Sequence, residues 1–492
     1  MPYRPGTQVI LRDIPTPRSV PVDTGQALVV GMSERGSTTL PTKLRSMIDF
    51  VKLLGDRQSY SGLYDWAETY FREGGATLYV QRVVGAAAAT ATKVLQATGA
   101  VNTLNIFANS PGAWGNSLKV AVLTGTTSGT VQLQVLRTIN AVDVVLEQSP
   151  DMFNKAEILS WAAGSQYITA TDNAGSTLLP LAIAATPLLT GADDNASVVD
   201  ANYVTGLTLL TADLGPGQVA IPGRTSATIL SALQAHAQLY NRFYVYDLVD
   251  TSTKATLEAA AQAGRSNANA RYGMVSGSWV TVPPLPTVPG TTRTVAGSSV
   301  ICGLIARSEG NGNTSNVPPA GDNGVLRFAL GTTQTFTDAD ADELYSNGIN
   351  LIRSRYGTYK LFGFRTLVDP YALPLWINAA NVRQIMAIYA RANAIAERFV
   401  LAQLDGKGLK VADFGAQLKS MLKPYFDAGS LYGDPSDPQN ADLAYRVDVG
   451  SIVNTPTTIQ NGELHAVLSL RLAPFAELVV IELVRAGITD NI

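Results

Sequence analysis

The hydrophobic pattern at the start of the chain predicts an α/β fold. Residues 27–30 form a continuous apolar run typical of a buried strand, and apolar residues recur at helical spacing over 42–54 and 62–73. The pair Gly74-Gly75 ends the second helix, and a further strand is expected over 77–84. This order of strand, two helices and strand is typical of the first part of an α/β domain.

A second α/β region is predicted later in the chain, where strands and helices alternate. The expected elements are strands over 218–221, 243–248 and 272–276, with helices over 226–240 and 253–263 between them. Strands joined by helices of this length run parallel, with right-handed crossovers. Exposed loops are expected over the Pro-rich segment 282–289 and the Gly- and Asn-rich segment 309–323.

Between these two regions the pattern changes to that of a small all-β domain. Short alternating runs at 118–123, 130–136 and 142–146 are separated by Gly, Thr, Ser and Asn. We therefore expect an inserted β-rich domain over 86–195.

The C-terminal region is predicted to hold two helices and two strands. The helices are expected over 378–403 and 411–426. The pair Asn461-Gly462 is a two-residue hairpin signal, and the alternation over 464–472 after it predicts a paired strand. The next apolar run, 478–484, predicts a strand with no partner nearby in the sequence.

The N-terminal arm carries a second strand of this kind. Prolines at positions 2, 5, 15, 17 and 21 exclude a helix over residues 1–22, and the one strand-like piece is 7–12. An apolar strand without a local partner favours pairing with another segment, in its own subunit or in a different one. Both ends of the chain therefore predict strands that need partners.

Composition narrows the classes of function. A chain of 492 residues is expected to hold about two to four domains. The net charge of −3 argues against a nucleic-acid partner. No stretch of about 18 apolar residues predicts a membrane span, and the first residues lack an apolar signal-peptide centre, so we expect a protein made in the cytosol. Sparse charge, at 15%, together with 43 glycines suits a protein that hides much of its surface against copies of itself.

Nucleophilic and histidine chemistry have few candidates. The single cysteine, Cys302, lies in an apolar run and is interpreted as a buried thiol. His236 shares a helix face with Leu233 and Tyr240, which indicates a packed side chain, and His465 lies on the polar face of its expected strand. Neither histidine lies in a metal-ligand motif.

Charged residues at the expected strand ends are candidates for an active site. Arg224, Asp247 and Asp250 lie at carboxyl ends of predicted parallel strands, where open sheets place active sites. Asp250 precedes 251–253 and the next helix, so a capping cluster is the preferred interpretation.

An acidic triplet resembles half of a calcium loop. Asp338, Asp340 and Asp342 alternate, but Glu343 and Ile349 stand where that loop needs Gly and Glu. A helix start, with Thr337 and Asp340 as a capping box, explains the pattern better. We therefore assign no catalytic, cofactor-binding or metal-binding residue.

A basic cluster near the second C-terminal helix is the remaining charged feature. It consists of Lys407, Lys410, Lys419 and Lys423. Such a cluster is either a solvated helix face or an electrostatic surface facing an acidic partner.

Several segments together resemble the contractile tail sheath proteins of bacteriophages and related contractile injection systems. The segments that carry the resemblance are 71–83 (FREGGATLYVQRV), 109–117 (NSPGAWGNS), 347–352 (NGINLI), 363–367 (GFRTL), 381–383 (NVR) and 473–477 (APFAE). Phe475 stands where the family usually has a second proline, and the arm reads Pro5-Gly6-Thr7 where the family usually has valine after the glycine. The resemblance spans nearly the whole chain.

This resemblance implies a fold and a division into domains. It implies an α/β protein in which residues 23–85 and 359–492 form one discontinuous α+β core domain. It also implies a subtilisin-like α/β domain without catalytic residues over 196–358, and the β-rich insertion over 86–195.

The resemblance also gives the two unpartnered strands a role. In the family, the arm of one subunit and the terminal strand of another add to a sheet in a third subunit. The residues implied in this linkage are Thr7, Gln8, Val9, Ile10, Leu11, Leu478, Val479, Val480, Ile481, Glu482, Leu483 and Val484. The flexible points would be 14–22 and the loop 455–460.

The implied function is structural, with no cofactor. Subunits would stack as rings of six around a tail tube, contact the tube through Lys419 and Lys423, and contract to drive the tube through the host envelope. Baseplate and tail terminator proteins would be further partners, and the virion tail, assembled in the host cytoplasm, the location. Two alternatives stay open: the sheath of a headless bacteriocin or secretion machine, and a subtilisin-like hydrolase.

Overall fold

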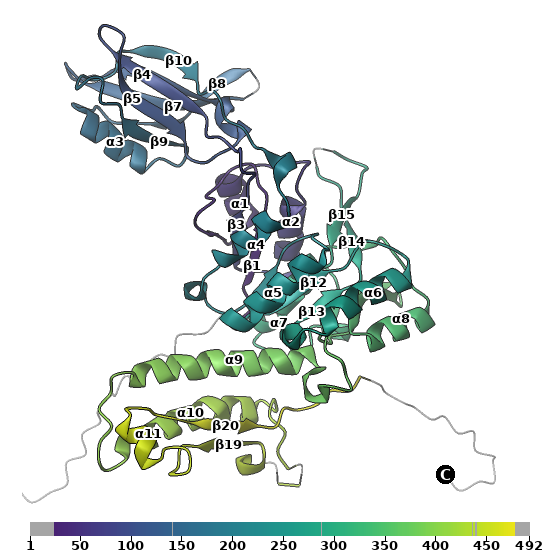
Figure 1. Ribbon diagram of the computed structural model, residues 1–492. Helices are drawn as coiled ribbons and strands as arrows, with labels where there is room; N and C mark the ends of the chain where they lie inside the picture. The colour runs from purple at the N-terminus through teal and green to yellow at the C-terminus, as the bar shows by residue number, and fades with distance from the viewer. Residues whose placement is uncertain (1–23, 140, 287, 435, 438–439, 478–492) are drawn as a thin grey trace, which may run out of the picture.

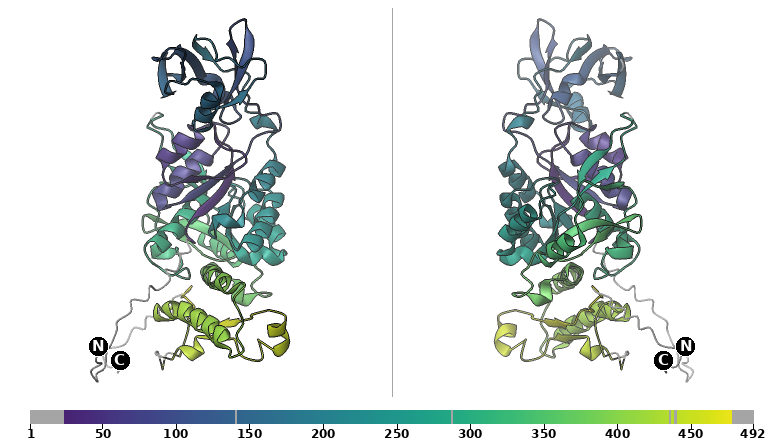
Figure 2. Two further views of the ribbon diagram at one scale, coloured as in Figure 1. Left: turned by 90° about the vertical axis from the view of Figure 1, so that its left-hand side faces the viewer. Right: turned by 90° about the vertical axis from the view of Figure 1, so that its right-hand side faces the viewer.

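The chain forms three parts arranged along one long axis (Figure 1). The structure is a computed structural model that describes residues 24–139, 141–286, 288–434, 436–437 and 440–477. An α/β body lies in the middle, a β insertion at one end, and a terminal unit built around α10 (Leu409–Asp427) and a two-stranded sheet at the other. The side views show the same elongated order of parts (Figure 2).

The α/β body is built on an eight-stranded sheet in the order β18-β17-β13-β12-β11-β1-β3-β2. Its strands are β1 (Ala27–Gly31), β2 (Thr42–Leu44), β3 (Leu78–Arg82), β11 (Gln218–Ala220), β12 (Phe243–Asp247), β13 (Gly273–Ser276), β17 (Ile349–Arg355) and β18 (Thr358–Phe362). The six inner strands are parallel, and β2 and β18 pair antiparallel at the two edges. The parallel sheet predicted from the alternation of strands and helices is confirmed.

Helices cover both faces of this sheet, because each strand alternates between two apolar clusters. In β1, Ala27 and Val29 join the cluster that contains α2 (Leu63–Glu73) and α7 (Ser298–Gly310), whereas Leu28 and Val30 join the cluster on the other face. The helices of the body are α1 (Met47–Leu54), α2 (Leu63–Glu73), α4 (Asp200–Thr208), α5 (Ala227–Tyr240), α6 (Lys254–Arg265), α7 (Ser298–Gly310) and α8 (Asp338–Ser346). A small sheet of β14 (Trp279–Val282), β15 (Arg293–Ala296) and β16 (Gly331–Thr332) adds to the first face.

The expected grouping of residues 23–85 with 359–492 is wrong for the strands of the N-terminal part. Ala27 of β1 pairs with Gln218 on one side and with Leu78 on the other, so β1 and β3 sit inside the sheet of the α/β body. Buried parallel strands carry the same apolar run whichever neighbour they have, so their pattern does not encode their partner.

The expected single helix over 42–54 is also partly wrong. Residues 42–44 form the edge strand β2, and α1 starts only after Ser46, whose hydroxyl accepts a hydrogen bond from the Asp49 N–H. A capping serine between two short apolar runs separates them into two elements.

The β insertion contains two sheets that pack around one apolar cluster. One sheet consists of β4 (Thr92–Ala97), β5 (Val101–Ala108) and β9 (Ile168–Asp172), and the other of β10 (Ile183–Pro187), β6 (Leu118–Thr124), β7 (Val131–Ile139) and β8 (Val142–Gln148). A helix not expected from the sequence, α3 (Lys155–Ala163), covers one side. Its side chains Ile158 and Ala162 are fully buried.

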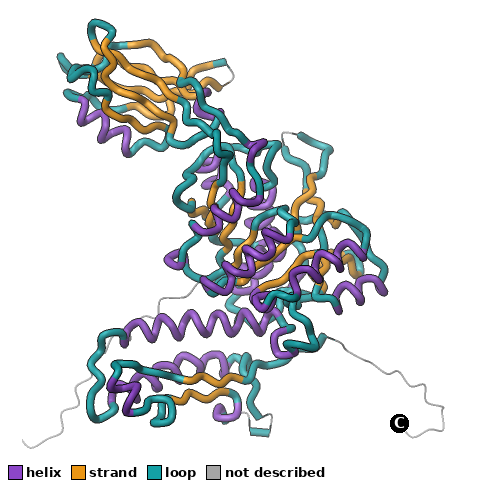
Figure 3. The backbone as a smooth tube through the Cα atoms, viewed as in Figure 1, coloured by secondary structure: helices purple, strands orange, loops and turns teal. Residues whose placement is uncertain are grey.

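The terminal unit follows the long helix α9 (Ala379–Ala396), which lies between it and the body (Figure 1). The unit consists of α10 (Leu409–Asp427), β19 (Tyr445–Asp448), α11 (Pro456–Gln460) and β20 (Val467–Leu470). Figure 3 shows how few strands it holds compared with the insertion and the body.

Two expectations about this unit need correction. Asn461-Gly462 makes no two-residue hairpin, because β20 pairs with β19, which ends at Asp448. The segment 455–460 is α11, capped by the Thr455 hydroxyl, and not a flexible loop. Asn454 holds the start and end of this connection by donating to the carbonyl oxygens of Val449 and His465, each at 2.8 Å.

Candidate functional site

The sheet of β19 and β20 is the feature most suited to receive strands from other chains. It has two strands only, and within the part of the chain that the structure describes neither strand has a partner on its outer side. A two-stranded sheet is marginally stable in water on its own. Its open edges are templates for further strands.

The hydrogen bonds show which backbone groups face the open edge of β20. Arg471 donates its N–H to the carbonyl of Ala444 and accepts from the N–H of Tyr432, so both of its backbone groups point towards β19. Backbone groups alternate in direction along an antiparallel strand, so the N–H and C=O of Leu470 and Leu472 point to the open side.

One face of the sheet is held by α10. Leu422 and Tyr425 of α10 form an apolar cluster with Tyr445 of β19, and Leu468 and Leu470 of β20 pack against it. The helix therefore covers one face of the two strands, and the described chain places no further strand at either outer edge.

The strand segments expected to pair between subunits, residues 7–11 and 478–484, lie outside the described residues. The described part shows their points of attachment, which begin at Thr24 and end at Glu477.

Lys419 and Lys423 lie exposed on α10, but each has an acidic neighbour. The Lys423 ammonium lies 2.8 Å from an Asp427 oxygen, and that of Lys419 lies 3.9 Å from an Asp442 oxygen. Both side chains are about two-thirds exposed, at 62% and 67%. Exposed pairs of this kind contribute little to stability, and the local positive charge is largely balanced.

The carboxyl end of β12 holds a buried hydrogen-bond network. Asp247 accepts from the Ser298 N–H at 2.7 Å and from the Ser298 hydroxyl at 2.6 Å, and that hydroxyl accepts from the Trp66 indole at 2.8 Å. Burial raises the pKa of Asp247 to about 6, against the hydrogen bonds that favour its ionised form. The Ser298 hydroxyl donates a hydrogen bond to the carboxylate and accepts one from the Trp66 indole, so this network joins α2, α7 and β12.

His236 belongs to α5 and lies beside the amino end of β12. Arg242, just before β12, donates from Nη1 to the Nε2 of His236 at 2.9 Å; a guanidinium can only donate, so Nε2 is the acceptor. Burial and the Arg242 charge lower the pKa of His236 to about 3. Asp247 lies five positions after Arg242, about 16 Å along the strand, so the histidine cannot serve as the base of a serine–aspartate site.

The other two candidates at strand ends also have structural partners. The Arg224 guanidinium stacks on the Tyr203 ring, 4.3 Å from its centroid, and lies 3.6 Å from an Asp200 oxygen. Asp250 accepts from the Thr333 hydroxyl at 2.6 Å, and Thr253, a member of the expected capping cluster, is the N-cap residue of α6.

The remaining candidate residues, Cys302, Thr337 and His465, also have structural surroundings. Cys302 is fully buried in α7, and burial raises the pKa of its thiol well above the ordinary value. Thr337 caps α8 as predicted by accepting from the Asp340 N–H. His465 lies before β20 rather than within it, 3.0 Å from Glu463. Among the described residues no group of His, Cys, Asp and Glu is arranged to hold a metal ion.

The segment 71–83 contains a fully buried carboxylate, that of Glu73. Glu73 is fully buried and accepts from the N–H groups of Arg327, Phe328 and Ala329 at 2.8–3.3 Å, with Arg307 at 3.4 Å. A Cβ at Gly303 would approach the Glu73 Cβ to 2.6 Å, so a glycine is needed in α7 where α2 ends.

The segment 109–117 forms the turn by which the insertion contacts the body. The Trp114 indole donates to the Ser110 carbonyl at 3.2 Å, and the Arg35 guanidinium of the body lies 5.6 Å from the centroid of the Trp114 ring. The Ser110 hydroxyl accepts from the Gly36 N–H at 3.1 Å. These contacts set the insertion on the body.

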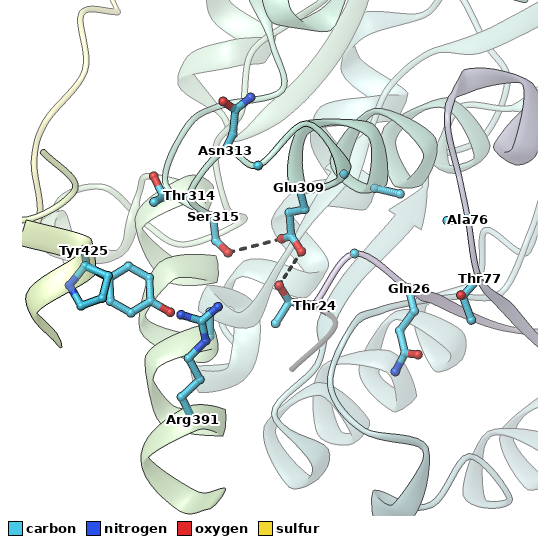
Figure 4. A pocket seen from close by; sticks show the side chains of 16 residues that line it. Thr24, Gln26, Ala76, Thr77, Glu309, Asn313, Thr314, Ser315, Arg391 and Tyr425 are labelled. Carbon is cyan, nitrogen blue, oxygen red and sulfur yellow. Dashed lines mark hydrogen bonds between the residues drawn. The ribbon is translucent and has the colours of Figure 1, made fainter. Parts of the chain in front are cut away.

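A recess of about 600 Å³ lies between the body and the terminal unit, where the described chain begins (Figure 4). Thr24 and Ser315 point to the Glu309 carboxylate, and Arg391 points to Tyr425 of α10. Glu309 also forms an ion pair with Arg383 of α9, whose side chain is buried. Sequence reasoning missed this group, since Glu309 and Arg383 lie 74 positions apart.

Comparison with known proteins finds likeness in structure. No protein-family profile matches the chain, and no curated protein matches it significantly in sequence. The sheath tail protein of Listeria innocua is 14% identical over 92% of this chain and 95% of its own, with a TM-score of 0.63. The contracted helical sheath of the anti-feeding prophage is 14% identical over 99% of this chain and 100% of its own, with a TM-score of 0.56. The contracted sheath complex of the extracellular contractile injection system PVC is 14% identical over 99% of this chain and 98% of its own, with a TM-score of 0.55.

The chain therefore has the fold of sheath tail proteins and of contractile injection system sheaths. It is a mixed α/β fold with several separate sheets, as the sequence predicts. None of its described helices combines the length and the apolar character needed to cross a lipid bilayer.

Proposed function

We propose that this chain is the structural subunit of a contractile tail sheath, assembled as stacked rings of six around a tail tube. Contraction would drive the tube through the host envelope to deliver a genome. The observation that carries the proposal is the β19–β20 sheet with two open edges, in a chain whose two ends each encode a strand without a local partner. The likeness in fold to sheath proteins supports it.

In this scheme residues 7–11 of one subunit and 478–484 of another add to the β19–β20 sheet of a third. Main-chain hydrogen bonds would join the subunits and would persist while the bodies change their packing. Contraction is then a rigid-body rearrangement, with residues 14–22 as a flexible connection. The part of the body over residues 196–358 would be subtilisin-like in fold and act without catalysis, with the insertion on the outside of the sheath.

The terminal unit would face the tube, and Lys419 and Lys423 are the proposed contact. Their acidic neighbours make shape and hydrogen bonding as important as charge on this surface. The double change K419E/K423E should weaken co-sedimentation with tube while the melting temperature stays within a few degrees, since both side chains are exposed. Unchanged co-assembly with tube would remove these residues from the proposal.

The same fold serves in injection machines, as the similar structures show for their own proteins. A headless bacteriocin or a secretion machine is therefore the alternative setting for the same assembly. Capsid and terminase genes beside the gene for this chain would identify a phage tail.

The strand exchange is tested by blocking the ladder at constant chain length. Proline at Val9 and Leu11 removes N–H donors from the arm strand, whereas threonine at both positions keeps them and is the matched control. We expect the proline variant to stay a folded monomer and the threonine variant to form tubular polymers visible by electron microscopy. Normal tubes from the proline variant, or from a chain lacking residues 1–12, would overturn the exchange.

A further inference from the structure

The last described residues are fixed to the body by an ion pair. Glu477 binds the Arg365 guanidinium, which also lies 4.0 Å from the centroid of the Tyr345 ring, and Phe475 packs against the apolar core of the body. The two segments that meet here, 363–367 and 473–477, are separated by more than a hundred residues in the sequence. The terminal segment therefore leaves from a defined point.

The first described residues are fixed in a similar way. The Thr24 hydroxyl donates to Glu309 at 2.5 Å, and the Thr24 carbonyl accepts from the side-chain amide of Gln218 at 2.6 Å. Glu309 is itself held by the buried Arg383 of α9. A hydroxyl, a carboxylate and a buried guanidinium thus hold the root of the arm.

Both attachment points lie beside the first turns of α9. The residue next to Arg365, Phe364, accepts at its carbonyl from the N–H of Ala379, the first residue of α9, at 3.1 Å. Arg383 follows four residues later, which is about 6 Å along the helix axis. The start of α9 thus contacts the segment that carries Arg365 and, through Arg383, binds Glu309, and the helix then runs along the terminal unit (Figure 1).

We infer that Arg365 and Glu309 are positioning residues that fix the exit points of the two terminal segments beside the first two turns of α9. The consequence for assembly rests on the proposed function: a pull on either segment reaches the helix that joins the body to the terminal unit. Bodies linked through these segments then keep a set direction towards the sheets of their neighbours.

The exit point can be tested in the monomer, independently of assembly. Spin labels at A476C and at L239C on α5 report the distance from the terminal root to the body, because Cys302 is fully buried and stays unlabelled. A narrow distance distribution is expected, which broadens at least about twofold with Glu477→Gln and stays narrow with Glu477→Asp, since the aspartate keeps the charge for Arg365. The exposed change Glu463→Gln is the matched control. An equally narrow distribution with Glu477→Gln would overturn the inference.

Assembly supplies a second readout that separates this inference from the proposed function. We expect Glu477→Gln and Thr24→Val each to raise the critical concentration for polymers about threefold or more, because a loosely held segment must be ordered on binding. The melting temperature of the monomer should stay unchanged. If the chain lacking 478–492 polymerises normally, the proposed function fails; if only that deletion blocks assembly and both point variants polymerise like the wild type, the positioning role alone fails.

Discussion

Replacing Glu73 by glutamine should destabilise the α/β body strongly, although only one oxygen becomes nitrogen. The Glu73 carboxylate is fully buried, and both of its oxygens accept backbone N–H groups of the loop at 327–329. Oε1 accepts from all three N–H groups, so a glutamine oxygen at that place keeps these bonds, but the new NH2 group at the Oε2 place would be a buried donor that faces the Arg327 N–H and the Arg307 guanidinium. Arg307 would also lose its buried counter-charge.

The magnitude follows from what remains unpaired. A buried donor without an acceptor costs about 1–3 kcal/mol, and breaking a buried ion pair by removing one charge costs about 3–5 kcal/mol. These terms describe the same site and overlap, so we expect a loss of about 3–5 kcal/mol in the free energy of unfolding of the body.

The assay is native-state hydrogen exchange, because a chain with several units need not unfold in one step. A loss of 3 kcal/mol corresponds to exchange faster by about a hundredfold or more at the amides of Phe328 and Ala329. The matched control is Glu343→Gln, since Glu343 makes its ion pair with Lys254 at 62% exposure, and that change should cost less than about 1 kcal/mol. Exchange in Glu73→Gln that matches the control would refute the reasoning.

Three further predictions concern buried groups of the body. Burial raises the pKa of Asp247 to about 6, above its unfolded value, so its contribution is present at low pH and is lost as pH rises through 6. Relative to Asp247→Asn, the wild type should lose about 2 kcal/mol between pH 4 and pH 7.5 in urea unfolding, and a constant difference would contradict this. Burial and Arg242 lower the pKa of His236 to about 3, so its effect on stability has the opposite pH dependence. Relative to His236→Asn, the free energy of unfolding of the wild type should be highest above about pH 6.5 and should fall as pH drops towards 3, which the same urea titration measures. Gly303→Ala should lower stability by about 1–3 kcal/mol, since the added carbon would meet Glu73, whereas Gly310→Ala, which has open space around it, should not; equal melting temperatures would count against the packing argument.

Local chemistry made much of the fold predictable from the sequence. Helices with a side-chain cap and an amphipathic face, such as α5 after Ser226, begin where the pattern predicts. The buried state of Cys302 and the packed state of His236 also follow from their apolar neighbours.

Pairing between distant segments was not predictable in the same way. The local hairpin signal at 461–462 did not decide the structure, because α11 forms just before it. The Thr455 cap and the two hydrogen bonds that Asn454 donates satisfy backbone groups of this connection. The partners of β1, and the ion pairs of Arg383 and Arg365, depend on which elements fold side by side, which apolar periodicity does not encode. For the same reason, the sequence predicts strands that lack a local partner but not the β19–β20 sheet whose edges could receive them.

The way the insertion joins the body has a practical consequence. Its two connecting chains run side by side, with Ala89 bonded to Ala192 and Thr92 to Leu189 as antiparallel bridges. Such bridges bring the two chains within about 5 Å of each other. The insertion is thus joined to the body at a single place, and a short turn there could close the body without it. A foreign domain whose termini lie close together could be grafted in its place. It would be displayed once per subunit on any polymer that the chain forms.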